Sequence, residues 1–149
     1  NTLKKLNYDL VELGTIFIEE FNLNFLTVEI EINGNKGLLI VDSGAGRSML
    51  HSKHFEKFAL NSNNTWSNQT TSGAGGAFNI AKIELAQLNF KQLNLGNPVF
   101  LSADLSVLVE FIQLKTGQTI DGVIGQYTLS QYSSVIDVVK ETLYMKIKP

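Results

Sequence analysis

The stretch Leu38-Leu39-Ile40-Val41-Asp42-Ser43-Gly44-Ala45 decides the interpretation of this chain, because an apolar strand ends there in an acidic side chain and a turn of small residues. A carboxylate at such a bend leaves a buried sheet at a point where it can take part in chemistry. Judged from this stretch alone, a purely structural Asp42, which caps the turn through nearby backbone amides, is as well supported as a chemical role. The rest of the sequence has to decide between the two roles.

The residues before this stretch predict a β-hairpin over 25–42. Apolar and acidic residues alternate over 28–32, and Asn33-Gly34 then supplies two residues that tolerate a positive φ. The second strand, 37–41, loses the alternation and becomes uniformly apolar, which is typical of a strand covered on both faces. Asp42 is therefore expected to leave from the centre of the fold.

Length and composition indicate one globular domain over residues 1–149. The formal net charge of -2 gives no reason to expect nucleic acid or anionic lipid as a partner. The absence of cysteine excludes disulfides and thiolate chemistry. No apolar run is long enough to span a bilayer, so we expect no membrane contact within this chain. The chain begins with Asn1, and we expect that an N-terminal segment is missing and that the protein is extracytoplasmic, either periplasmic or secreted.

Beyond the turn, the sequence predicts mostly strands. We expect strands near 47–50, 79–85, 88–95, 99–102, 120–124, 134–137 and 142–147, brief helices over 52–58 and after Gly125, and an exposed loop over the polar stretch 61–72. Residues 105–112 fit a helix or a strand equally.

Two further pieces of sequence are rich in glycine or apolar residues. The run Gly73-Ala74-Gly75-Gly76-Ala77-Phe78 predicts a mobile hairpin tip, since glycines tolerate many backbone conformations. The run Asp121-Gly122-Val123-Ile124-Gly125 predicts a buried strand that opens into a short helix.

Taken in order, the Asp42-Ser43-Gly44-Ala45 turn, the 73–78 hairpin tip and Val123-Ile124-Gly125 resemble the three signatures of retropepsin-like aspartic proteases of the bacterial single-domain type. The resemblance covers about residues 24–147. The N-terminal extension, 1–23, lies outside it, and its apolar residues would suit an added strand. The implied fold is mainly β, a closed or partly open barrel with a flap hairpin and one to three short helices.

The resemblance implies an aspartic endopeptidase that hydrolyses peptide or protein substrates without a cofactor. Two carboxylates must share one proton, so that one activates a water while the other polarises the peptide carbonyl. Because one Asp-Ser-Gly occurs in the chain, the second carboxylate would be the Asp42 of another copy in a homodimer. The implied roles are catalysis for Asp42, Ser43 and Gly44, substrate binding for Ala45, Gly73, Ala74, Gly75, Gly76 and Ala77, and support of the site for Val123, Ile124 and Gly125.

Parts of the sequence also fit three other interpretations. A phosphate-binding loop at Gly44-Ala45-Gly46 lacks the third glycine and the lysine that such loops use. His51 and His54 stand three residues apart, but an exposed helix start is expected for them in place of a metal site. The strongest alternative is a catalytically silent retropepsin-like domain that binds peptides or partners, because a fold does not fix a function. Gln126 and Arg47 also depart from the residues that the family more often carries there.

Overall fold

The computed structural model describes residues 2–60, 65–73, 76–85, 87–91 and 93–147. The elements are α1 (Thr2–Lys5), β1 (Asp9–Glu12), β2 (Gly14–Ile18), η1 (Glu19–Phe21), β3 (Leu23–Ile32), β4 (Asn35–Val41), β5 (Met49–His51), η2 (Ser52–His54), η3 (Glu56–Phe58), β6 (Thr65–Gly73), β7 (Gly76–Glu84), β8 (Leu88–Phe90), β9 (Leu93–Asn94), β10 (Val99–Ala103), α2 (Ser106–Thr116), β11 (Gly122–Ile124), α3 (Gln126–Gln131), β12 (Val135–Asp137) and β13 (Thr142–Met145). The fold is mainly β, as the sequence predicts.

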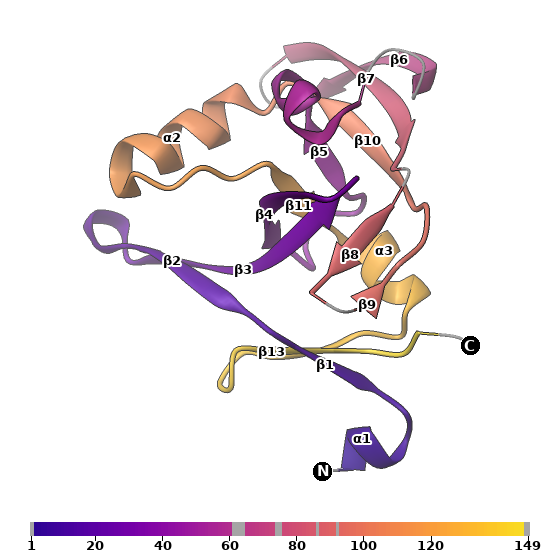
Figure 1. Ribbon diagram of the computed structural model, residues 1–149. Coiled ribbons are helices and arrows are strands. Elements are labelled where there is room, and N and C mark those ends of the chain that lie inside the picture. Colours follow the sequence, from indigo (N-terminus) through magenta and orange to yellow (C-terminus); the bar gives the residue numbers. More distant parts are fainter. Residues whose placement is uncertain (1, 61–64, 74–75, 86, 92, 148–149) are drawn as a thin grey trace.

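The strands form two sheets. The large sheet has the order β6-β7-β10-β5-β11-β4-β3-β8-β9, with β2 added on β3, and the small one has the order β1-β13-β12. Figure 1 shows the β6–β7 hairpin at the upper end of the molecule and the small sheet of β1 and β13 at the lower end, below the curled large sheet. The N-terminal extension therefore contributes strands to both sheets.

The predicted hairpin over 25–42 is confirmed. β3 and β4 pair antiparallel from Leu26↔Val41 to Ile32↔Asn35. The two turn residues, Asn33 and Gly34, have φ values of 53° and 81°, the positive values that a two-residue hairpin turn requires.

The centre of the large sheet is formed by β4, β11 and β5. β11 pairs parallel with β4 and antiparallel with β5, although it lies more than 70 residues further along the chain than β5. Gly122 makes this approach possible, since a Cβ there would lie 2.1 Å from the carbonyl oxygen of Met49. The three strands place the turn after β4 next to the end of β11.

The apolar strand β4 is covered on both faces. Leu39 and Val41 belong to the main core with Val28, Ile30 and Ile124, whereas Ile40 points into a second core. The second core is formed by Ile16, Val109, Ile112, Ile120 and Val123. Burial on both sides explains why residues 37–41 show no alternation of apolar and polar residues.

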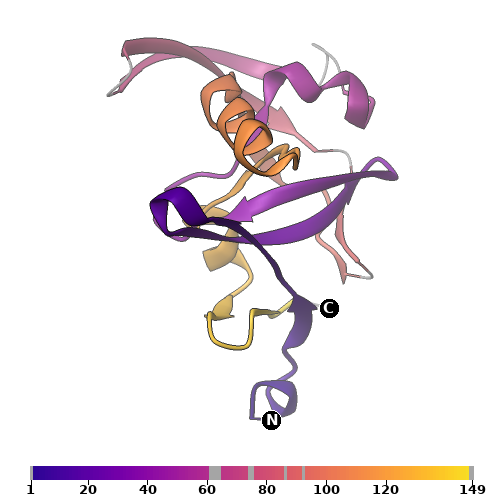
Figure 2. The same ribbon diagram turned by 90° about the vertical axis from the view of Figure 1, so that its left-hand side faces the viewer.

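α2 provides one side of the second core. Residues 106–116 are helical, which resolves the choice left open for 105–112, and Val109 and Ile112 are its buried residues. The helix packs on β2, and Figure 2 shows it between the β2–β4 region and the β6–β7 hairpin. No helix among the described residues has the length and apolar character to cross a membrane.

One expectation from the sequence was wrong, and another was only partly right. The polar stretch 61–72 was expected to be an exposed loop, but residues 65–72 belong to β6 and pair antiparallel with β7; residues 61–64 lie outside the described part. Residues 52–58 form two 3₁₀ turns, η2 and η3, in place of one brief helix. In β6, the main chain makes the pairing with β7, so the polarity of the side chains does not indicate a strand there.

Candidate active site

Asp42 lies immediately after β4, where the chain leaves the centre of the large sheet. Its backbone N–H donates to the carbonyl oxygen of Ile124, the last residue of β11, at 3.0 Å. The residue itself is exposed, as are Ser43 and Gly44. The sheet therefore fixes the backbone of Asp42 and leaves its carboxylate free to meet a ligand.

The turn is closed by its own backbone amides. The N–H of Gly44 donates to the Oδ1 atom of Asp42 at 3.0 Å, and the N–H of Ala45 donates to the Asp42 carbonyl oxygen at 3.1 Å. A Cβ on residue 44 would lie 3.2 Å from the same Oδ1 atom, closer than side-chain carbons normally approach. The absence of a side chain at residue 44 lets this amide reach the carboxylate and orient its Oδ1 atom.

Val123-Ile124-Gly125 lies next to this turn. Val123 and Ile124 are buried, and a Cβ on Gly125 would come within 2.7 Å of the carbonyl oxygens of both Ala45 and Arg47. The N–H groups that open α3 bind the same segment, since Gln126 donates to the Ala45 carbonyl at 2.7 Å and Tyr127 to that of Gly46 at 3.0 Å.

Ser48 connects the turn to α3 from below. Its buried Oγ accepts a hydrogen bond from the N–H of Gly125 at 2.8 Å and shares another with the Thr128 hydroxyl at 2.6 Å. Its carbonyl oxygen accepts from the N–H of Leu101 on β10 at 2.9 Å. Ser48 is therefore a support of the site, and its place six residues after Asp42 is the only hint of this in the sequence.

The expected flap residues lie on the hairpin of β6 and β7. Gly73 pairs with Gly76 at its end, and Ala77 follows on β7, while Ala74 and Gly75 lie outside the described residues. The hairpin joins the centre of the sheet through β10, which pairs with both β7 and β5. Ser43 lines a separate groove of about 500 Å³, whose other walls come from α3 and the residues that follow it.

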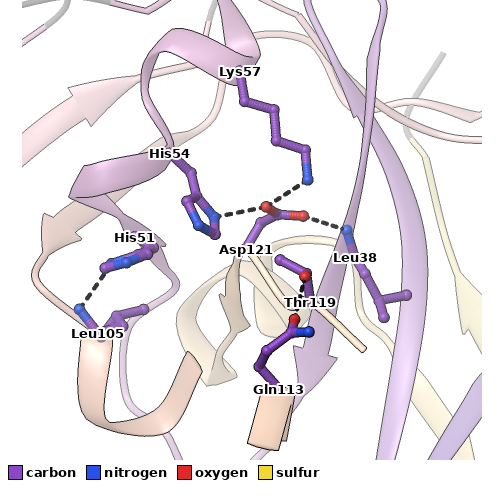
Figure 3. A network of polar contacts seen from close by, with 8 residues as sticks. All are labelled: Leu38, His51, His54, Lys57, Leu105, Gln113, Thr119 and Asp121. Carbon is purple, nitrogen blue, oxygen red and sulfur yellow. Dashed lines mark hydrogen bonds and ion pairs between the residues drawn. The ribbon is translucent and has the colours of Figure 1, made fainter. Parts of the chain in front are cut away.

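A polar network that sequence reasoning missed lies beside the middle of β4, at Leu38. The carboxylate of Asp121 is fully buried; its Oδ1 contacts His54 Nδ1 and Lys57 Nζ, both at 2.8 Å, and its Oδ2 accepts from the N–H of Leu38 at 2.9 Å (Figure 3). Backbone bonds join Asp121 to Leu38 and His51 as well. An acidic residue within the apolar run 120–124 is the signal that could have revealed it.

The expectation for the histidines was also wrong. His51 ends β5 and is buried, and its Nδ1 atom accepts a hydrogen bond from the N–H of Leu105 at 3.0 Å (Figure 3). Burial, and then the neighbouring His54, lowers the pKa of His51 below its ordinary value of 6.5. Within the described ranges, no group of three or more His, Cys, Asp or Glu side chains could hold a metal ion.

Comparison with solved structures shows the same fold in retroviral-type proteases. A retropepsin-like aspartic protease from Rickettsia conorii has a TM-score of 0.60 at 16% identity and covers 93% of this chain and 98% of its own. The retroviral protease-like domain of Ddi1 from Leishmania major has a TM-score of 0.61 at 20% identity, and the match covers 84% of this chain and 94% of that domain's chain. The EIAV protease, complexed with the inhibitor HBY-793, has a TM-score of 0.55 at 16% identity, and the match covers 75% of this chain and 91% of the protease chain.

Comparison at the level of sequence gives the family. A search of curated proteins found no match. The family model described as aspartyl protease matches residues 28–128, which is more than half of the chain and includes the Asp42 turn and Gly125. Together with the retropepsin-like fold, this match shows that the chain belongs to the aspartyl protease family.

Proposed function

We propose that this protein is an aspartic endopeptidase and that its active form is a homodimer with one Asp42 from each subunit. The observation that carries the proposal is the exposed Asp42 carboxylate, held at a small-residue turn by the Gly44 amide at 3.0 Å. Membership of the aspartyl protease family supports the reaction type. The retropepsin-like fold supports the assembly, because one chain carries one Asp-Ser-Gly turn.

In the proposed reaction, the ionised carboxylate takes a proton from a water molecule, and the water oxygen attacks the carbonyl carbon of the peptide bond. The other, protonated carboxylate donates a hydrogen bond to the carbonyl oxygen and stabilises the tetrahedral intermediate. The C–N bond then breaks, and the proton passes to the leaving amine. Gly44 keeps each carboxylate in place, and Ala45 leaves room for the substrate. The β6–β7 hairpin, with Gly73, Gly76 and Ala77, closes over the bound peptide.

Replacement of Asp42 by Asn tests the proposal. The amide oxygen of Asn can still accept the hydrogen bond from Gly44, so the turn keeps its shape while the base is lost. We expect cleavage of a denatured protein substrate to fall at least about a hundredfold, with an unchanged circular dichroism spectrum and melting temperature. Asp104→Asn is the matched control, because Asp104 is an exposed acidic residue whose cap on Ser106 an Asn can also make.

The dimer is tested by mixing. If subunits exchange freely, an equal amount of Asp42→Asn chain converts half of the wild-type subunits into mixed dimers, so the activity of a fixed amount of wild-type chain should fall to about half. An activity that does not change on mixing contradicts the shared site. A wild-type chain that sediments as a monomer at every concentration and cleaves nothing would favour the alternative, a catalytically silent peptide-binding domain.

A further inference from the structure

A second groove begins at the segment that carries the catalytic turn. Its volume is about 570 Å³, and its walls include Arg47, Lys82, Val99, Tyr127 and Tyr132. Arg47 comes from the segment between β4 and β5, Lys82 from β7, and the two tyrosines from α3 and the residue that follows it. The lining residues thus come from separate parts of the chain.

The charges in this groove are all positive. Two of its lining residues are cations, Arg47 and Lys82, and no Asp or Glu lines it. The guanidinium carbon of Arg47 lies 4.6 Å from the centre of the Tyr127 ring, a stacking contact that holds the arginine without neutralising it. Across the described part of the chain, no ion pair joins either cation to a carboxylate, although four other lysines have one.

The groove is rigidly joined to the proposed catalytic centre. Arg47 is five residues beyond Asp42, and the carbonyl oxygen of the intervening Gly46 accepts the hydrogen bond from the Tyr127 amide at 3.0 Å. On the far wall, the Tyr132 hydroxyl donates to the Leu95 carbonyl at 2.9 Å. The orientation of the groove relative to Asp42 is therefore fixed by the backbone of the same turn.

We propose that this groove is a specificity site that binds an acidic side chain of the peptide substrate, at a position away from the scissile bond. The inference rests on the proposed function. Unpaired cations attract a carboxylate, and an arginine can bind it through two parallel hydrogen bonds. A nucleic acid fits less well, because only two cations line the groove and the chain as a whole carries a net charge of -2.

The test uses octapeptides with two apolar central residues and a single Glu, or a single Gln, moved through the other six positions. At about pH 6 the glutamate is ionised. We expect kcat/KM to be about three- to tenfold higher for Glu than for Gln at one position, a ratio that corresponds to one or two partly exposed ion pairs. The ratio should fall toward one at high salt, because salt screens such pairs.

Variants then assign the preference to the groove. Arg47→Gln and Lys82→Gln should each lower the Glu/Gln ratio, and Arg47→Glu should shift the preference toward a Lys at the same position. Lys36→Gln is the control, since it removes one positive charge at the opposite end of β4 and should leave the ratio unchanged. A ratio of one at every position, or a preference that survives both Gln variants, overturns the inference.

Binding to the Asp42→Asn variant separates this inference from the proposed function. Fluorescein-labelled copies of the same peptides are titrated with that variant, and polarisation reports binding without any cleavage. Tighter binding of one Glu peptide, abolished by Arg47→Gln in the same background, supports the specificity site even if the wild-type chain cleaves nothing. Equal binding of the Glu and Gln peptides refutes it even if the chain is an active peptidase.

Discussion

Gly125 is the residue whose replacement most directly couples packing to the geometry of the candidate active site. An added Cβ would lie 2.6 Å from the Arg47 carbonyl oxygen and 2.7 Å from that of Ala45, and both are backbone atoms that cannot rotate away. To reach an ordinary contact, the turn that follows Asp42 must move by roughly 0.7–0.8 Å, since interiors are close-packed and offer no other space. Gly125→Ala is therefore expected to be both destabilising and harmful to activity.

The size of the effect follows from three contributions. Overpacking against rigid neighbours costs about 1–3 kcal/mol. The movement also weakens two hydrogen bonds, from Gly125 N–H to Ser48 Oγ and from Gln126 N–H to the Ala45 carbonyl, each contributing about 0.5–1.5 kcal/mol. We expect a loss of about 2–6 kcal/mol in the free energy of unfolding, and a domain in the middle of the ordinary stability range, about 5–15 kcal/mol, stays folded after such a loss.

The activity should fall further than the stability alone explains. A displacement of a catalytic group by about 1 Å can lower a rate roughly a hundredfold, so we expect a ten- to hundredfold loss of peptide cleavage under conditions where Gly125→Ala is folded. Urea denaturation followed by circular dichroism gives the stability, and cleavage of a fluorogenic peptide well below the unfolding transition gives the activity.

Gly46→Ala is the matched control. Gly46 belongs to the same turn, but a Cβ there meets nothing within 4 Å and its backbone conformation is open to other residues. We expect its stability to stay within about 0.5 kcal/mol of the wild type. A Gly125→Ala chain that is as stable and as active as Gly46→Ala would refute the packing argument.

Two further predictions concern the network around Asp121 and His51. Asp121→Asn removes a fully buried charge that contacts His54 and Lys57, and we expect it to lower the free energy of unfolding by about 2–4 kcal/mol. Lys57→Gln, whose side chain is 40% exposed, should cost under about 1 kcal/mol, and equal losses in the two variants would contradict the importance of the buried carboxylate. Because the pKa of His51 is lowered on folding, the unfolded chain binds more protons than the folded one below about pH 6.5; the stability contributed by neutral His51 is complete above that pH and declines as the pH falls toward the folded pKa. His51→Gln, which can still accept the Leu105 hydrogen bond, should lose stability less steeply between pH 7 and pH 5 in urea titrations, and parallel profiles would count against this assignment.

Structural features that depend on residues close together in the chain can be predicted from the sequence. The 25–42 hairpin was evident because the alternation over 28–32 and the Asn-Gly turn act within a few residues of each other. The role of Gly125 as a support of the site comes from the resemblance to a family and stays a prediction, which Gly125→Ala tests. β6 was missed, because its residues show no apolar pattern and its pairing with β7 is made by the main chain.

The contacts that sequence reasoning could not find join residues far apart in the chain. Asp121 meets His54 and Leu38 across separations of 67 and 83 residues, and His51 meets Leu105 across 54. The burial of His51 depends on its position at the end of β5, between β11 and β10 in the sheet. Such contacts follow from the strand order, which the local pattern does not contain.

The described hydrogen bonds of the Asp42 turn lie within one chain, whereas the proposed chemistry needs the Asp42 of a second copy. The carbonyl oxygen of Ile124 accepts from the Asp42 amide, the Gly44 amide donates to the carboxylate, and the Gln126 amide donates to the Ala45 carbonyl. Folding of a single chain therefore pre-forms half of the proposed site. In the proposed dimer the second carboxylate meets a turn that is already ordered, so association has little backbone entropy to lose at that point. The concentration at which activity appears should then follow the dimer dissociation constant, with no slow rearrangement of the turn after assembly.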